Sequence, residues 1–306
     1  MNETIQQEMS SRSIAGETAT TVSTAGATDA CNGCIALQSQ DYLRQNRLPH
    51  IWCPGCGNGI VLHAIVKALE MLSLDRNNVA AVSGIGCSSR SAGYLDLNTV
   101  HTAHGRALPF ATGIKVANPK LTVLVMSGDG DATAIGGNHF IQAARRNLDL
   151  TLIIFNNNIY GMTSGQYSPL TPRGAFATTA TYGNVETPFD ICKLAIAAGA
   201  TYVARGTTYQ ARQLPKLIVN AIKNKGFSVV EAVCACPTHY GKLNKKSSPV
   251  ALLQEQRDKA ISAKDAQLMT AEQLTGKYLT GELFSENRRE YSDSYTHLFE
   301  RVHETK

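Results

Sequence analysis

The chain has 306 residues, of which 43% are hydrophobic and 17% are charged, as in an ordinary globular protein. Its formal net charge of +5 is small and spread along the sequence, so nothing in it predicts a nucleic-acid partner. The apolar runs are far too short to cross a bilayer, and the polar first forty residues lack the apolar block of a secretory signal. We therefore expect no membrane span and a cytoplasmic location.

Composition divides the chain into three parts. Residues 1–45 are rich in Ser, Thr and Ala and predict a disordered leader. Residues 46–245 alternate apolar runs with helical patterns and predict the folded domain. Residues 246–306 are polar and charged, with helical periodicity over 250–269, and predict a partly helical extension.

The middle part alternates helices and strands in chain order. Apolar runs predict strands at 78–86, 120–128, 148–158, 201–206 and 227–236. Helical periodicity predicts helices at 58–72, 136–147, 189–200 and 211–226. The strand, helix and strand within 120–158 form a βαβ unit, which predicts an α/β fold whose parallel sheet has helices on both faces. Residues 165–184 have no periodicity and predict a long loop of the kind that is commonly functional.

Oxygen ligands follow two neighbouring strands of this unit. The turn "GDG" places Asp129 after the strand at 120–128, and Asn157 stands at the end of the strand at 148–158. Ligands of a parallel sheet bind at the carboxyl ends of its strands, and the helix that follows the turn offers its N-terminus to an anion. A carboxylate and an amide oxygen, completed by a diphosphate, suit Mg²⁺. The sequence thus predicts a diphosphate and magnesium site, whereas an isolated "GDG" would indicate only a tight turn.

The segment "DGDAT", which begins at Asp129, also matches the D-x-D-x-T motif of haloacid-dehalogenase phosphatases. Such phosphatases also need a paired acidic motif at a strand end. Because no two acidic residues are adjacent anywhere in this chain, we disfavour the phosphatase interpretation.

Eight cysteines are candidates for metal or redox chemistry, because a chain without an export signal favours these over disulfides. They are Cys31, Cys34, Cys53, Cys56, Cys87, Cys192, Cys234 and Cys236. The pair Cys31 and Cys34 could share a zinc ion with Cys53 and Cys56. A thioredoxin-like pair is disfavoured, because its C-x-x-C opens a helix after a strand. Thiolates from scattered strand ends suit a [4Fe–4S] cluster, and Cys192 in a periodic helix is expected to be a buried apolar residue.

Six segments in this order resemble the β subunit of 2-oxoacid:ferredoxin oxidoreductases, over about residues 48–245. They read "WCPGCGNG", "GIGCSS", "HGRALPFATGIK", "GDGDATAIGGNHFIQAARRN", "FNNNIYGMTSGQYSPLTP" and "CPTHYGK". The wording of the third and fifth segments looks most like the 2-oxoglutarate branch. The resemblance implies a thiamine-diphosphate-binding fold.

The resemblance also assigns site residues. It places a [4Fe–4S] cluster on Cys53, Cys56, Cys87 and Cys236, with Cys234 as the neighbour that could be mistaken for a ligand. It places Mg²⁺ on Asp129, Asn157 and the carbonyl of Ile159. Thiamine diphosphate would contact Ile85, Gly86, Cys87, Ser88, His104, Gly128, Asp129, Gly130, Asp131, Gly161 and Met162. The leader with Cys31 and Cys34 lies outside the family pattern, so its role stays open.

Two of these residues are candidates for contact with the reacting groups. His104 is expected to contact the diphosphate or a substrate carboxylate, the alternative being a structural bond to a backbone carbonyl. Pyruvate-specific relatives commonly read "YSNTGGQ" where this chain reads "YGMTSGQ", which places Met162 near the substrate and suggests a different 2-oxoacid.

The resemblance implies CoA-dependent oxidative decarboxylation of 2-oxoglutarate to succinyl-CoA, with electrons passing to ferredoxin or flavodoxin, or the reverse carboxylation. An α subunit would supply the glutamate that activates the cofactor, in an αβ or (αβ)₂ assembly. Pyruvate or a branched 2-oxoacid is the alternative substrate. The alternative of another class is a non-catalytic module, either zinc-stabilised or dedicated to electron transfer.

Overall fold

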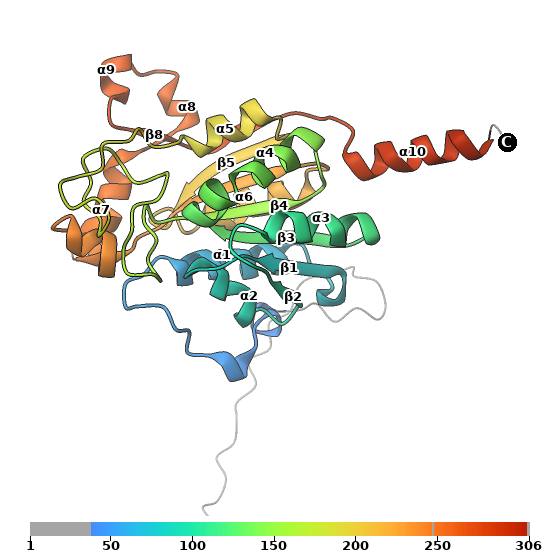
Figure 1. Cartoon of the computed structure of the whole chain (residues 1–306), viewed down its shortest axis with the longest axis horizontal. Coiled ribbons are helices and arrows are strands. Elements are labelled where there is room, and N and C mark those ends of the chain that lie inside the picture. The colour runs from blue at the N-terminus through green and yellow to red at the C-terminus, as the bar shows by residue number, and fades with distance from the viewer. Residues whose placement is uncertain (1–37, 247, 305–306) are drawn as a thin grey trace, which may run out of the picture. The chain divides into compact units, whose positions relative to one another are not determined.

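The structure, a computed structural model, describes residues 38–246 and 248–304. Its centre is a sheet in the order β2-β1-β3-β4-β6-β5-β8-β7 (Figure 1). Pairs from β2 through to β5 are all parallel, which confirms the predicted parallel sheet, and β8 runs antiparallel beside β5. The strands are β1 Val79–Ser83, β2 Asn98–His101, β3 Thr122–Gly128, β4 Thr151–Asn156, β5 Tyr202–Thr207, β6 Ser228–Val233, β7 Ala260–Ser262 and β8 Tyr278–Ser285.

Helices cover both faces of the sheet, as predicted. On one face α1 and α6 pack against each other, and on the other α3, α4 and α5 form the cover. Because helices cover both faces of the sheet, β4 is buried at every position. A strand buried in this way reads as a nearly continuous apolar run in the sequence. The helices are α1 Asn58–Met71, α2 Ser91–Tyr94, α3 Ala107–Ala117, α4 Gly137–Arg146, α5 Ile191–Ala198, α6 Leu214–Lys223, α7 Pro249–Lys259, α8 Ala263–Ala266, α9 Ala271–Leu274 and α10 Tyr291–Glu304.

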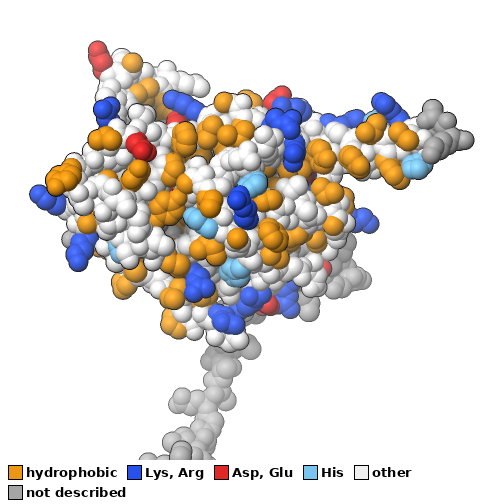
Figure 2. Space-filling view, in the orientation of Figure 1, with side chains coloured by type: hydrophobic (Ala, Val, Ile, Leu, Met, Phe, Trp, Pro, Cys, Tyr) orange, Lys and Arg blue, Asp and Glu red, His pale blue; other side chains and the backbone are white. Residues whose placement is uncertain are grey.

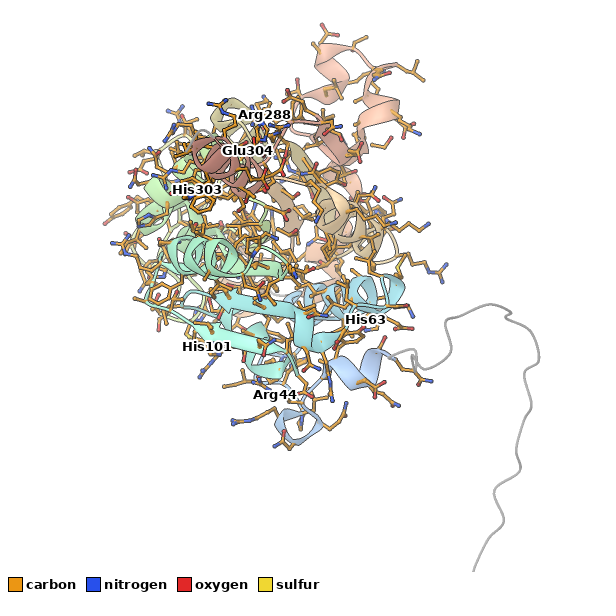
Figure 3. All side chains as sticks on the ribbon, turned by 90° about the vertical axis from the view of Figure 1, so that its right-hand side faces the viewer. Arg44, His63, His101, Arg288, His303 and Glu304 are labelled. Atoms are coloured by element: carbon orange, nitrogen blue, oxygen red, sulfur yellow. The ribbon has the colours of Figure 1, made fainter. Side chains whose placement is uncertain are left out.

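The edge strand β2 was not predicted from the sequence. Its four residues are polar or only partly buried, so they lack the apolar run that marks the central strands. Its position is fixed instead by pairing with β1 and by Arg44, whose Nη2 donates to Oγ1 of Thr99 at 2.9 Å. Arg44 and His101 lie together at this edge in Figure 3.

The C-terminal part differs from the single helical stretch expected at 250–269. Helix α7 ends at Lys259, and β7 follows at once and pairs with β8. Ser262 then caps α8, because its side chain accepts from the backbone N–H of Asp265. Helical periodicity alone therefore misread a helix, a strand and a second helix as one element.

The folded domain includes part of the segment expected to be a leader. Tyr42 is fully buried against α1, and its hydroxyl donates to the carbonyl of Leu74 at 2.7 Å. The folded domain therefore begins before residue 46, although the segment around Tyr42 is mostly polar. Residues 1–37, with Cys31 and Cys34, lie outside the described part of the chain.

Candidate active site

The carboxyl ends of β1, β3 and β4 surround a cavity of about 170 Å³. The structure brings together there every residue that the sequence assigned to thiamine diphosphate, namely Ile85, Gly86, Cys87, Ser88, His104, Gly128, Asp129, Gly130, Asp131, Gly161 and Met162. The expected magnesium ligands Asn157 and Ile159 line the same cavity. Phe155, Tyr160 and Thr163 also line it and were not predicted, although they belong to the motif that begins near the end of β4.

Asp131 fixes the loops that form the cavity wall. One oxygen of its buried carboxylate, Oδ1, accepts from the backbone N–H groups of Ile85 at 3.2 Å and Gly105 at 2.8 Å. The same oxygen lies 2.5 Å from Nδ1 of His104. The hydroxyl of Ser127 donates to the other oxygen at 2.5 Å. The turns after β1, β2 and β3 are therefore fastened to one side chain.

Asp129 lines the cavity with a side chain that is almost fully buried. Oδ2 accepts from the hydroxyl of Ser168 at 2.5 Å, a contact that crosses from the long loop after β4 and was not predicted. Burial raises the pKa of Asp129 to about 7, and the charge of Glu231 adds to this rise. A bound cation would offset the cost of burying this carboxylate, so the residue fits a metal ligand.

The asparagine turn after β4 has the shape of a coordinating loop. Oδ1 of Asn157 accepts from the backbone N–H of Ile159 at 3.2 Å, which brings that side chain and the backbone of Ile159 to one side of the turn. Both residues are buried at the cavity. Oxygen donors from this turn and from Asp129 match the donor set that Mg²⁺ takes.

Tyr160 covers the GDG turn. Its hydroxyl donates to the carbonyl of Gly130 at 3.2 Å, and a Cβ on Gly130 would overlap the tyrosine ring. Burial, together with the charges of Asp129 and Asp131, raises the pKa of Tyr160 to about 12. The hydroxyl therefore stays protonated and remains a donor near neutral pH.

Four thiols gather beside this cavity. A Cβ on Gly161 would lie 3.5 Å from Sγ of Cys87 and 3.7 Å from Sγ of Cys236, so both sulfurs face this glycine. Burial, then neighbouring thiols including Cys53 and Cys236, raises the pKa of Cys56 to about 12 and that of Cys87 to about 11. Cys236 is buried, Cys56 and Cys87 are partly buried, and Cys53 is exposed. Thiols whose pKa is raised by burial keep their protons until a metal replaces them, so Cys56, Cys87 and Cys236 fit a thiolate-bound centre.

The arrangement of the thiols bears on which centre they fit. In the described part of the chain, no three His, Cys, Asp or Glu side chains are arranged to hold one metal ion. An iron–sulfur cluster binds each thiolate at a separate iron atom, so its ligands need not meet at a point. The cysteines described form no disulfide.

The two other described cysteines have polar partners. Cys192 is buried in α5, as expected, but it is not merely apolar, because its thiol donates to Oε2 of Glu231 at 3.2 Å. Cys234 is buried near the four thiols and donates to Oδ1 of Asn58 at 3.6 Å. The resemblance gave neither residue a ligand role.

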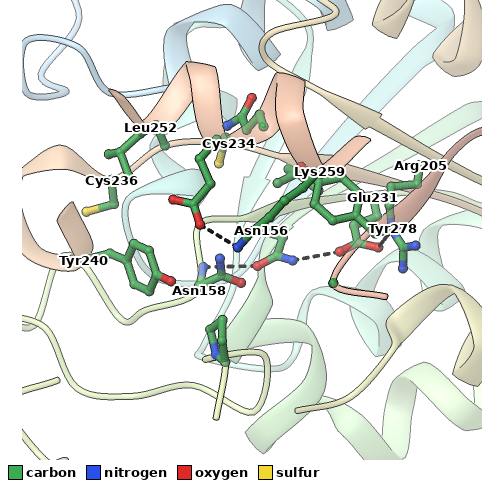
Figure 4. Close-up of a pocket in the computed structure, with 16 residues that line it drawn as sticks. Asn156, Asn158, Arg205, Glu231, Cys234, Cys236, Tyr240, Leu252, Lys259 and Tyr278 are labelled. Carbon is green, nitrogen blue, oxygen red and sulfur yellow. Dashed lines mark hydrogen bonds and ion pairs between the residues drawn. The ribbon is translucent and has the colours of Figure 1, made fainter. Parts of the chain in front are cut away.

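A second cavity, of about 230 Å³, lies next to Cys236 and was not predicted (Figure 4). Arg205 and Glu231 form a buried ion pair in its wall, with Nε 2.7 Å from Oε2, and Asn156 donates to the other oxygen of Glu231 at 2.7 Å. Lys259 pairs with Glu255 at 2.5 Å in the same wall. These charges neutralise one another within the protein.

Comparison with known proteins identifies the family. The chain is 52% identical over 252 residues to the 2-oxoglutarate synthase subunit KorB of Methanothermobacter marburgensis, covering 82% of this chain and 88% of that protein. The chain belongs to the β subunits of 2-oxoacid:ferredoxin oxidoreductases. This β subunit is also 61% identical over 199 residues to the KorB subunit of Archaeoglobus fulgidus, covering 65% of this chain and 74% of the relative.

Two further comparisons agree. A model of the C-terminal TPP-binding domain of thiamine pyrophosphate enzymes matches residues 84–232 of the β subunit, the part that holds every residue lining the first cavity. The β subunit resembles the solved 2-oxoglutarate:ferredoxin oxidoreductase of Magnetococcus marinus with 33% identity and a TM-score of 0.79, covering 90% of this chain and 94% of that one. That structure was determined with 2-oxoglutarate, coenzyme A and succinyl-CoA bound. The thiamine-diphosphate-binding fold expected from the sequence is confirmed.

As a member of this family, the β subunit is part of an oxidoreductase that needs a partner subunit. Its described helices include none with the length and apolar character of a membrane span.

Proposed function

We propose that this chain binds thiamine diphosphate and Mg²⁺ in the 170 Å³ cavity and a [4Fe–4S] cluster on Cys53, Cys56, Cys87 and Cys236. With an α subunit it would catalyse CoA-dependent oxidative decarboxylation of 2-oxoglutarate to succinyl-CoA, or the reverse carboxylation, in the cytoplasm. Ferredoxin or flavodoxin would exchange the electrons. The observation that carries the proposal is the position of Gly161, which lines the cavity and faces two of the four thiols.

Different residues of the chain would contact different parts of the bound cofactor. Asp129, Asn157 and the carbonyl of Ile159 would hold Mg²⁺ and, through it, a diphosphate. His104 is held through Nδ1 by Asp131, so Nε2 is the ring nitrogen able to reach a ligand. Bound thiamine diphosphate supplies the nucleophilic carbon for decarboxylation, and an adjacent cluster supplies a one-electron acceptor.

The rim of the cavity suits a covering partner. Ile85 and Met162 are each nearly half exposed although they line the cavity, and Ile135 is similarly exposed close to Gly105. Such apolar side chains at the mouth of a site favour burial against a second protein. On the face shown in Figure 2, basic side chains are more frequent than acidic ones, in line with the net charge of +5.

An α subunit is the partner proposed for this rim. Among the described residues that line the cavity there is no glutamate, so the glutamate that activates the cofactor would come from the α subunit. The assembly would be αβ or (αβ)₂. The name of the Magnetococcus marinus enzyme and its bound 2-oxoglutarate support the choice of substrate.

The test is anaerobic purification of the chain together with its α subunit. A brown protein with about four irons per chain and Mg²⁺-dependent binding of thiamine diphosphate is expected. The Asp129→Ala variant should lose that binding, whereas the exposed Asp265→Ala variant should retain it. A colourless, zinc-containing protein would refute the cluster, and a preference for pyruvate or a branched 2-oxoacid over 2-oxoglutarate would refute the substrate.

A further inference from the structure

A buried amide beside the proposed cluster ligands has an unused donor. Asn58, the first residue of α1, is fully buried, yet its side-chain Nδ2 has no hydrogen-bond partner. Only four buried side-chain nitrogen or oxygen atoms in the described residues lack a partner, so this donor is an exception in a well-satisfied interior. Leaving a buried donor unpaired is costly, which indicates that the functional protein places an acceptor there.

Two contacts fix the orientation of Asn58 among the thiols. Its backbone N–H donates to the Cys56 thiol, two residues earlier in the chain. Its side-chain Oδ1 accepts from Sγ of Cys234 at 3.6 Å. Because Cys234 occupies Oδ1, Nδ2 is the end of the amide that is left for another acceptor.

The surroundings of Asn58 show what that acceptor can be. Gly57, which joins Cys56 to Asn58, packs against Cys234, because a Cβ on Gly57 would lie 2.7 Å from Cβ of Cys234. The next proposed ligand, Cys236, is only two residues beyond Cys234. The amide that Cys234 holds therefore lies within the group of proposed ligands. The sulfur atoms of a cluster bound there would be anionic acceptors at this point.

We propose that Nδ2 of Asn58 donates a hydrogen bond to a sulfur of the cluster, either the Cys56 thiolate or an inorganic sulfide, and so raises its reduction potential. The donor stabilises the reduced cluster more than the oxidised one, because reduction adds negative charge to the sulfurs. Cys234 acts as a positioning residue, since it selects which end of the amide faces the cluster. The inference rests on the proposed function, because it requires the cluster.

The test is the midpoint potential of the cluster in the αβ holoenzyme, measured by redox titration followed by EPR. Asn58→Leu removes the donor while keeping the volume, and we expect the potential to fall by the equivalent of a tenfold change in the reduction equilibrium, about 59 mV for one electron. Cys234→Ala should lower the potential by less, with iron content unchanged. Gln210→Leu is the matched control and should leave the potential unchanged. Oε1 of Gln210 is also buried without a partner, but the other end of this amide, Nε2, contacts Thr280 at 3.5 Å and not a thiol.

An Asn58→Leu enzyme with full iron content and an unchanged potential would overturn the inference. If that variant does not retain its cluster, the hydrogen bond is tested in the wild-type enzyme instead. Asparagine labelled with ¹⁵N only in its side-chain amide should give a ¹⁵N coupling in pulsed EPR of the reduced cluster, and the absence of this coupling would refute the hydrogen bond. A wild-type protein that contains no iron would refute the proposed function instead, so the two failures are distinguishable.

Discussion

The carboxylate of Asp131 and the imidazole of His104 lie 2.5 Å apart, from Oδ1 to Nδ1, and this contact ties the turn after β3 to the loop after β2. The same oxygen also accepts from the backbone N–H of Ile85, in the turn after β1. One buried side chain thus holds three loops that reach the cavity from different strands. The second aspartate of the "GDGD" sequence, Asp131, therefore holds the loops of the cavity wall in position.

Replacing Asp131 should loosen the cavity wall. Asp131→Ala would leave the buried N–H of Gly105 and the hydroxyl of Ser127 without their acceptor, and we expect a loss of about 2–4 kcal/mol in the free energy of unfolding. Affinity for thiamine diphosphate should fall at least about tenfold for the same reason. Urea unfolding and calorimetric titration measure the two effects. Asp258→Ala removes only an exposed ion pair with Arg257 and should cost less than about 1 kcal/mol; equal losses in both variants would contradict the role of Asp131.

Replacing Gly161 with a larger residue should prevent a cluster from binding. In Gly161→Ala the added methyl group meets Sγ of Cys87 at 3.5 Å and Sγ of Cys236 at 3.7 Å, which are ordinary contacts in the metal-free protein. We expect the free energy of unfolding of that form to change by no more than about 0.5 kcal/mol. Iron content should nevertheless fall well below that of the wild type, because the methyl group takes space between the two sulfurs.

A second glycine supplies the control for this experiment. A Cβ on Gly113, within α3, would meet nothing within 4 Å. Gly113→Ala should therefore leave iron content unchanged and stabilise the helix by about 0.5–1 kcal/mol. Full iron content in Gly161→Ala, measured beside this control, would show that the cluster does not approach Gly161.

The cysteine set makes a separate prediction. Cys236→Ser should lose most of the visible absorption of the anaerobically purified protein, because a ligand has been removed. Cys192→Ser should keep it, since that thiol contacts Glu231 and its replacement can still donate to the same carboxylate. Absorption and iron analysis on both variants check this. Equal loss of absorption in the two would show that the assignment of ligands to Cys236 and its partners is wrong.

The sequence predicted the core and the cavity well for physical reasons. Strands β1, β3 and β4 are buried on both faces and therefore appear as continuous apolar runs. Residues that follow such strands meet at one edge of a parallel sheet, which is why the predicted site residues converge on one cavity. The antiparallel β8 escaped prediction, because four of its eight residues are partly buried and three are exposed, so its pattern is not clearly apolar.

The contacts that depend on tertiary folding could not be read from the sequence. Ser168 donates to Asp129 across 39 positions, from a loop with no periodicity. Nothing in the apolar runs of β5 and β6 indicated that Arg205 and Glu231 would face each other across the two strands. Such partners are set by strand order and register, which a local pattern does not specify.

The buried ion pair of Arg205 and Glu231 should be important for stability even though it lies outside the proposed site. Arg205 donates from Nε to Glu231 at 2.7 Å and from Nη2 to Asp190 at 2.6 Å. Arg205→Met would leave the carboxylate of Glu231 buried without its counter-charge, and we expect a loss of about 3–5 kcal/mol in the free energy of unfolding. Adding Glu231→Gln to this variant should recover part of the loss, since no buried charge then remains between the two strands.

The same arginine predicts how stability changes with pH. Burial raises the pKa of Asp190, but the charge and hydrogen bond of Arg205, together with the backbone N–H of Lys193 and its charge, outweigh burial and hold the pKa below the ordinary value of 3.8. A lowered carboxyl pKa adds stability that is present above about pH 4 and is lost as the pH falls through the folded-state pKa. Urea unfolding of the wild type should therefore show a loss of stability below pH 4 that is smaller in Asp190→Asn, while both lose little between pH 5 and 7. An acid dependence as steep in Asp190→Asn as in the wild type would show that Asp190 does not contribute to it.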